Sequence, residues 1–202
     1  MAHITDGILG AAAYAPITVA NAKVFLRIPS DVTTYDDYLT NLLVPGVIAE
    51  AETMCGGALY ARTVTDELHD IEVNCQDRIK TYYRPIIQVY ALTNDASAVS
   101  SSDYAVRKKA GIVVLKSDYF VVGYETGKIS YQAGFTEAGF PNDLRDRMYM
   151  IVSEIYDEDY ANKDSFYEKT GRSVVQMKIR EKMQYDPTIN RILMRYGAMG
   201  IT

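Results

Sequence analysis

The sequence predicts an α+β protein: a small helical bundle with an inserted antiparallel β-sheet and an extended C-terminal arm. Apolar residues recur at helical spacing near the start of the chain and again after residue 140. Between residues 60 and 135, short runs of β-branched and aromatic residues alternate with polar ones and are separated by turn residues. Of the 202 residues, 48% are hydrophobic and 23% are charged, which is the composition of an ordinary globular protein.

Two helices are predicted before the strands. The first covers residues 18–28, with Thr18 as its N-cap and Pro29 ending it. The second covers residues 36–54, where leucine and other apolar residues recur every three or four positions. Pro45-Gly46 lies inside this pattern, so we expect a kink there or a split into two helices.

The middle of the chain is predicted to form one small antiparallel sheet. The run Glu125-Thr126-Gly127-Lys128 has the pattern of a tight hairpin turn, with Gly127 in the left-handed conformation. A polar stretch of small residues, 94–102, is predicted to be a loop. The predicted strands are residues 60–68, 78–83, 86–92, 104–107, 112–115, 119–124 and 128–133.

The strongest predicted helix covers residues 141–160 and begins at Pro141. One face is aliphatic, and a second stripe beside it consists of Tyr149, Tyr156 and Tyr160. A helix that is apolar on two faces must bury both. The tyrosine stripe is therefore predicted to meet either the sheet or another subunit, and an inter-subunit contact is our hypothesis for these three residues.

The two ends of the chain are predicted to lie outside the core of residues 18–164. Residues 1–17 are interpreted as an N-terminal arm ordered by a neighbour, or else as a frayed terminus. In the extension, residues 165–202, the alternating run 173–179 is too short to distinguish a strand from a helix. Asp186-Pro187 starts a short amphipathic helix that either docks on a partner or folds back onto its own core.

The net charge of −5 argues against a general nucleic-acid binder. Its distribution is uneven: residues 142–164 carry seven acidic and three basic side chains, a net −4, whereas residues 169–202 carry seven basic and two acidic ones, a net +5. This pattern suits head-to-tail contact between identical neighbours, or a basic arm that reaches an acidic partner, or two solvated faces. No apolar run is long enough for a membrane span, so no membrane partner is predicted.

No catalytic, cofactor-binding or metal-binding constellation is found in the sequence. The phosphate-binding loop and the nucleophile-elbow motifs are absent. His69 has no nucleophile or acid at useful spacing and is expected at the surface or at an edge. The consecutive acids Asp157, Glu158 and Asp159 point in different directions on a helix, so they do not converge on one ion. We therefore expect a protein that is not an enzyme.

The segment 128–158, KISYQAGFTEAGFPNDLRDRMYMIVSEIYDE, resembles the strand end, loop and proline-opened helix of the tailed-bacteriophage head–tail connector family, also called head-completion or adaptor proteins. The run Arg84 to Val89 resembles that family's proline-containing strand, and residues 24–37 resemble its N-terminal leucine, arginine and acidic pattern. The resemblance covers residues 18–160. The positions that match the motif, to which we assign structural roles, are Tyr131, Ala133, Gly134, Phe135, Pro141 and Leu144.

The resemblance implies a structural subunit of the phage neck in the virion, made in the host bacterial cytoplasm. It implies a ring, a dodecamer by analogy, that joins the portal at the capsid vertex to a stopper or tail protein and extends a channel through which DNA passes without specific binding. The alternatives are a stopper or tail-completion protein one ring lower, or an unrelated interaction module. In the extension, the residues predicted to bind the portal are Val175, Met177, Ile179, Arg180, Ile189, Arg191, Ile192, Leu193, Arg195 and Tyr196.

Overall fold

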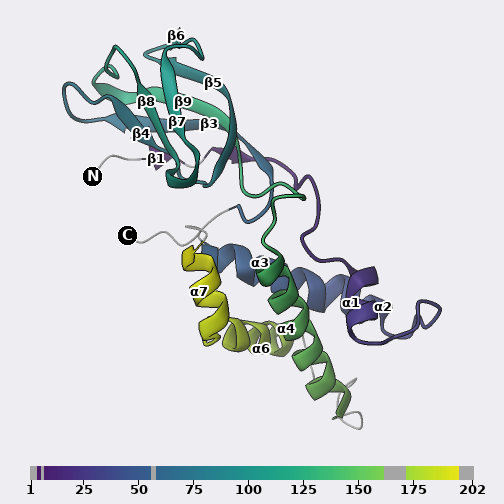
Figure 1. Ribbon diagram of the computed structural model, residues 1–202. Coiled ribbons are helices and arrows are strands. Elements are labelled where there is room, and N and C mark those ends of the chain that lie inside the picture. Colours follow the sequence, from purple (N-terminus) through teal and green to yellow (C-terminus); the bar gives the residue numbers. More distant parts are fainter. Residues whose placement is uncertain (1–3, 6, 56–57, 162–171, 196–202) are drawn as a thin grey trace. The chain divides into compact units, whose positions relative to one another are not determined.

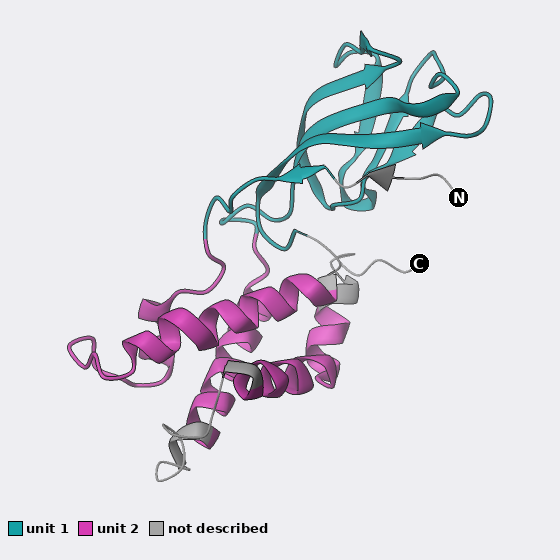
Figure 2. Ribbon diagram, turned by 180° about the vertical axis from the view of Figure 1, so that it is seen from behind, with its two compact units in different colours: residues 1–14, 56–139, 202 teal, residues 15–55, 140–201 magenta. Residues whose placement is uncertain are grey.

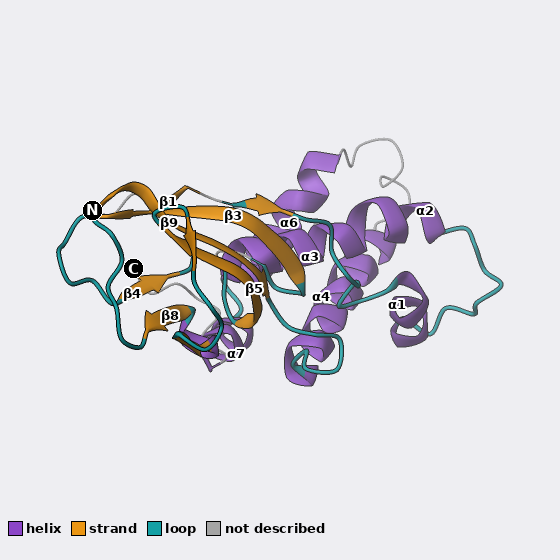
Figure 3. Ribbon diagram, turned by 90° about the horizontal axis from the view of Figure 1, so that it is seen from above, coloured by secondary structure: helices purple, strands orange, loops and turns teal. Residues whose placement is uncertain are grey.

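The computed structural model describes residues 4–5, 7–55, 58–161 and 172–195, which form two compact units (Figure 2). The sheet unit comprises residues 1–14 and 56–139, and the helical unit comprises residues 15–55 and 140–201. The strands belong to the first unit and the α-helices to the second (Figure 3). The α+β class is thereby confirmed. The division differs from the predicted arm, core and extension, because the N-terminal residues pair with the sheet and the extension packs with the helices.

The helical unit begins with α1 (Val19–Phe25), for which the predicted N-cap is confirmed: the Thr18 side chain accepts the backbone N–H of Asn21 at 3.2 Å. The chain leaves the helix through Arg27, whose φ is 58°, two residues before Pro29. Lys23 is buried and donates to the Val32 carbonyl at 2.7 Å, and it also forms an ion pair with the side chain of Asp36 at 2.8 Å. This lysine therefore ties α1 to the loop that leads into the next helix.

The predicted second helix is one continuous element made of α2 (Asp36–Tyr38), a π-helical turn η1 (Leu39–Leu43) and α3 (Val44–Cys55). This wider π turn ends two residues before Pro45, next to the position where a kink or a split was predicted. Pro45 has no N–H and its ring collides with a regular helical turn, and a π turn just before it gives the backbone the extra room. Gly46 leaves space for α6 (Arg172–Gln184), since a Cβ there would lie 2.6 Å from Ile179 Cδ1.

The C-terminal extension folds back onto its own unit. Its helices α6 and α7 (Pro187–Arg195) pack against α3 and α4 (Asn142–Ala161), as Figure 1 shows. The run 173–179, which the sequence left open, is helical because Val175, Ile179 and Met183 form a buried stripe along α6. The two helices thus complete the core of the bundle. The buried residues of this core include Leu39, Leu43, Val47, Leu144, Met148, Ile151, Val152, Ile155, Val175, Ile179, Met183 and Ile189.

The sheet unit contains two antiparallel sheets where one was predicted. The larger has the strand order β1-β3-β9-β5-β6, with β2 also paired to β3, and the smaller has the order β4-β8-β7. Inward-facing residues of both sheets fill one shared core, so each sheet buries one face. The strands are β1 (Ile4–Thr5), β2 (Ile8–Leu9), β3 (Arg62–Ile71), β4 (Arg78–Lys80), β5 (Ile86–Asn94), β6 (Ser97–Ala98), β7 (Tyr104–Arg107), β8 (Ile112–Leu115) and β9 (Gly123–Ala133), with a 3-10 turn η2 (Lys108–Ala110).

The prediction of a strand at 119–124 and a hairpin at 125–128 is wrong. Strand β9 runs unbroken from Gly123, and the left-handed residue is Glu125, at φ 55°, and not Gly127. Residues 119–122 form no strand ladder. The Asn94 side chain accepts the Val121 N–H at 2.8 Å and donates to the Tyr119 carbonyl at 3.0 Å, and the Phe120 N–H donates to the Gln76 carbonyl at 2.8 Å.

Candidate interaction surfaces

The residues of the connector-like motif hold the exit of the chain from β9. Gly134 has a φ of 97°, and a Cβ there would lie 2.5 Å from the Tyr60 carbonyl oxygen, so only glycine fits. The Tyr14 hydroxyl donates to the Phe135 carbonyl at 3.0 Å. Pro141 precedes α4, and its carbonyl accepts the N–H of Arg145 at 3.0 Å, while Leu144 is buried in the helical core. Gly134 and Pro141 thus lie where the chain leaves β9 and enters α4, and the structural roles of the motif residues stay a prediction.

Tyr131, another residue of the motif, lies within the sheet unit. Its ring lies in the core of the sheet unit, and its hydroxyl donates to the buried carboxylate of Glu67 at 2.5 Å. Glu67 also accepts the Tyr82 N–H at 2.9 Å and contacts His69 Nε2 at 2.9 Å. Burial, together with the neighbouring Glu67, raises the pKa of Tyr131 above its usual range.

His69 is therefore buried and not at the surface as predicted. His69 lies two residues after Glu67 on β3, so both side chains point to the same face of the sheet. There Glu67 supplies the polar partner that a buried imidazole needs. The Tyr83 N–H closes the cluster by donating to the Tyr131 hydroxyl at 3.0 Å. The buried polar cluster thus joins β3, β9 and the segment after β4, which is a structural arrangement.

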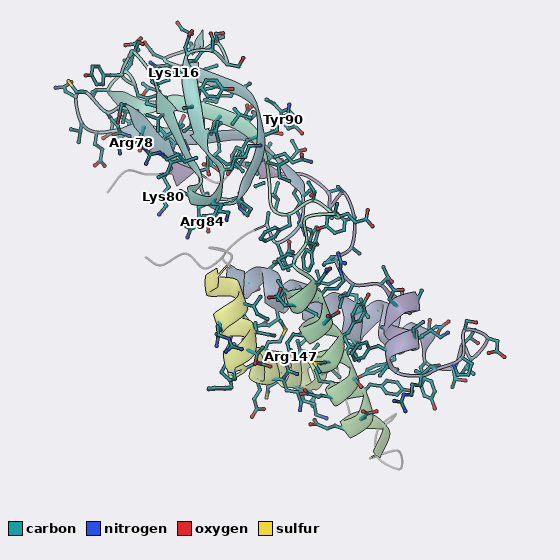
Figure 4. The ribbon with its side chains drawn as sticks, in the orientation of Figure 1. Arg78, Lys80, Arg84, Tyr90, Lys116 and Arg147 are labelled. Carbon is teal, nitrogen blue, oxygen red and sulfur yellow. The ribbon has the colours of Figure 1, made fainter. Side chains whose placement is uncertain are left out.

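The acidic α4 and the basic extension meet inside one chain. Arg147 of α4 binds Asp186 and also Glu154, the latter at 3.1 Å, and Lys182 of α6 binds Glu158 at 2.5 Å (Figure 4 labels Arg147). Burial by itself would raise the pKa of Asp186, but Arg147 and two backbone N–H groups outweigh it and lower that pKa. Some of the complementary charges that suggested contact between neighbouring subunits are thus paired within the helical unit.

Two of the three tyrosines predicted at a subunit interface are buried within their own chain, which corrects that hypothesis. The Tyr149 hydroxyl accepts the Thr18 N–H at 3.1 Å, and its ring stacks on Phe25 with centroids 5.7 Å apart. Tyr156 packs edge-on against Tyr35 at 5.5 Å. The second apolar face of α4 is thus covered by the N-terminal helical segment. The side chain of Tyr160 lies outside the described residues.

The residues predicted to bind the portal divide into buried and exposed groups. Val175, Ile179, Ile189 and Ile192 are buried in the helical unit and cannot contact a partner while it stays folded. Met177, Arg180 and Arg191 are exposed. The side chains of Leu193 and Arg195, and the whole of Tyr196, lie outside the described residues.

The exposed side of α6 presents a stripe that the sequence analysis missed. Val174 is 41% exposed, Met177 68% and Tyr185 81%, and Glu181 lies between the last two on the same side. We call these four residues the α6 outer face. Their spacing of three or four residues becomes visible as a stripe only once the segment is known to be helical. Val174 and Met177 on the packed helix α6, together with Tyr185 in the turn that follows it, form a candidate protein-binding surface.

No described helix is long and apolar enough to cross a membrane. Among the same residues, no three His, Cys, Asp or Glu side chains gather where they would hold a metal ion. An open polar hollow beside the β5-β6 hairpin is lined by serines and by Asp95, Asp103, Asp118 and Lys116, whose opposite charges make it a mixed surface.

The arrangement of two N-terminal helices, a sheet insertion, a glycine exit and a long helix is the one expected for a head–tail connector. No protein-family model and no curated protein matches the sequence. A chain of the neck of an empty gene transfer agent (GTA) particle, computed with C6 symmetry, has a TM-score of 0.53 at 14% identity, over 88% of this chain and 95% of that one. A chain of the native GTA virion has a TM-score of 0.52 at 16% identity, over 88% and 94%. The resemblance seen in the sequence is confirmed at the level of the fold.

Proposed function

We propose that this chain is a structural subunit of a phage-type neck, where copies of it form a ring. The observation that carries the proposal is a fold shared with a GTA neck chain over nearly the full length of both chains. The described residues add exposed apolar side chains on the α6 outer face, which suit assembly with another protein. The protein accordingly acts by binding other proteins in the virion and not by chemistry.

Within the neck, we propose the adaptor position, directly below the portal, in a ring that extends the DNA channel toward a stopper or tail protein. The α6 outer face is the proposed portal contact and replaces the extended arm predicted from the sequence. Met177 is its centre, because it is exposed, flexible and flanked one turn away by Val174 and Glu181. Complete burial of such a side chain contributes about 1.5–3 kcal/mol.

The test is binding of the purified chain to purified portal. Met177→Glu should weaken binding by tenfold or more, corresponding to at least about 1.4 kcal/mol. Met150→Glu is the matched control, since Met150 is also exposed on the helical unit but lies on α4. Truncation after Asp164 is a poorer test because it removes α6 and α7 from the core. Equal binding by both variants would exclude the α6 outer face as the contact.

The position in the neck and the ring size need a second experiment. An adaptor binds the portal alone, whereas a stopper or tail-completion protein needs the adaptor first. Electron microscopy of the complex counts the copies, for which a dodecamer is expected. A chain that binds a preformed portal–adaptor complex but never the portal alone would move the assignment one ring lower.

A further inference from the structure

The outward face of the small sheet in the sheet unit carries a concentration of positive charge. Strand β4 alternates, with Arg78 and Lys80 exposed and Ile79 buried in the core. Strand β7 ends in the exposed Arg107, and η2 continues at once with Lys108 and Lys109, which are exposed as well. We call these five residues the basic sheet face.

The strand register brings these side chains together. Lys80 lies opposite Ile112 on β8, and Ile112 lies opposite Arg107 on β7, so Lys80 and Arg107 share one row and one face of the sheet. Two strand spacings separate their backbones by about 10 Å. Arg78 occupies the next row on the same face, and Figure 4 shows Arg78 and Lys80 along β4.

Most of these cations are free. Lys80, Arg107, Lys108 and Lys109 have no ion-pair or hydrogen-bond partner among the residues that the structure describes, whereas Lys23, Arg147 and Lys182 of the helical unit are all paired.

Arg78 alone binds a carboxylate, that of Asp77, at 2.8 Å. The hydrogen bond from Arg78 holds the pKa of Asp77 below its usual range, with a smaller contribution from Arg107. The face therefore keeps a local excess of four unpaired charges in a chain whose net charge is −5.

We propose that the basic sheet face binds the phosphate backbone of double-stranded DNA without reading its sequence. Regularly spaced phosphates are the complement of several flexible, unpaired cations on an open sheet surface. A second copy of this chain is the poorer complement, because part of the negative charge of its helical unit, at Asp36, Glu154 and Asp186, is already paired. The binding does not depend on the proposed place in the neck.

The experiment measures DNA binding by fluorescence anisotropy with a duplex of about 30 base pairs, at salt concentrations from about 50 to 200 mM. Four phosphate contacts predict a slope of log K against log salt of about −3.6, from about 0.9 for each contact. The double variant Lys80→Gln with Arg107→Gln should reduce it to about −1.8 and weaken binding at every salt concentration. Lys178→Gln with Arg191→Gln in the helical unit removes the same two residue types and the same net charge, and should leave the slope unchanged.

Three results overturn the proposal. The first is that the unchanged chain shows no binding at the lowest salt. The second is that the two double variants lose affinity equally, which would reduce the effect to net charge. The third is that the Lys80 and Arg107 variant binds DNA normally but loses ring formation or portal binding, which would make the face a protein contact. Circular dichroism of both variants shows that each remains folded. Because the portal is absent from the anisotropy measurement, its outcome is independent of the proposed function.

Discussion

Asp186 caps one helix and holds another, so its replacement removes two interactions at once. One carboxylate oxygen accepts the backbone N–H groups of Thr188 and Ile189 at 2.7 and 3.1 Å, which caps α7, and the other oxygen binds Arg147 of α4. The residue is 6% exposed. Loss of an N-cap costs about 1 kcal/mol. Loss of the charge partner adds about 1 kcal/mol, well below the value for a fully buried pair, because Arg147 is partly exposed and keeps Glu154.

Asp186→Ala should therefore destabilise the helical unit by about 2 kcal/mol. Asp186→Asn keeps an acceptor for the cap and should cost about half as much. Urea unfolding followed by circular dichroism at the helix band reports on this unit, and the shift in midpoint at unchanged slope measures the loss. If the alanine variant is no less stable than the asparagine variant, the cap contributes nothing and the reasoning fails.

The same pair predicts a pH dependence. The pKa of Asp186 is lowered in the folded chain, so its charge contributes stability that is complete above the unfolded value of about 3.9. That contribution is lost as the pH falls below this value toward the folded pKa. The difference in stability between the original chain and the alanine variant should hold from pH 7 to about 5 and shrink below about 4. A difference that stays constant down to pH 3 would contradict the ion-pair contribution.

Two further substitutions test the sheet unit. Gly134→Ala should cost more than about 2 kcal/mol, because a Cβ would meet the Tyr60 carbonyl 2.5 Å away at a backbone φ of 97°, and a thermal melt with less than about 0.5 kcal/mol of loss would refute this. Tyr131→Phe removes the donor to Glu67 and the acceptor for Tyr83, and should cost about 1–3 kcal/mol. Tyr124→Phe, at a ring 89% exposed, is its control and should change stability by less than about 0.5 kcal/mol.

Several features could be predicted from the sequence because they depend on neighbours within a few residues. The caps at Thr18 and Asp186 are interactions of a side chain with backbone amides two or three residues later, so the residue types at these positions predict them. The strand-rich middle follows from its alternating composition, and the long helix after Pro141 from its spacing. The exit at Gly134 carried the resemblance to head–tail connectors, and its strained backbone angle explains why glycine occupies it.

The candidate site was predicted less well. Of the residues predicted to bind the portal, Met177, Arg180 and Arg191 are exposed, but the prediction grouped them with Val175 and Ile179, which face the core. The run 173–179 is compatible with a strand as well as with a helix, and the two structures expose different side chains. The α6 outer face, with Val174 and Tyr185, could therefore not be recognised before the segment was known to be helical.

The sequence by itself determined the class of fold, the order of the elements, most of the helix starts and the resemblance to neck proteins. The tertiary structure decided what each amphipathic element packs against. It placed Tyr149 of α4 against Phe25 of α1 and paired Glu158 of the acidic helix with Lys182 of the basic extension. It also buried His69 beside Glu67 and brought Lys80 and Arg107 into one row. The physical reason is range: a local pattern shows that a face is apolar or charged, but its partner is chosen by contacts between residues far apart in the chain.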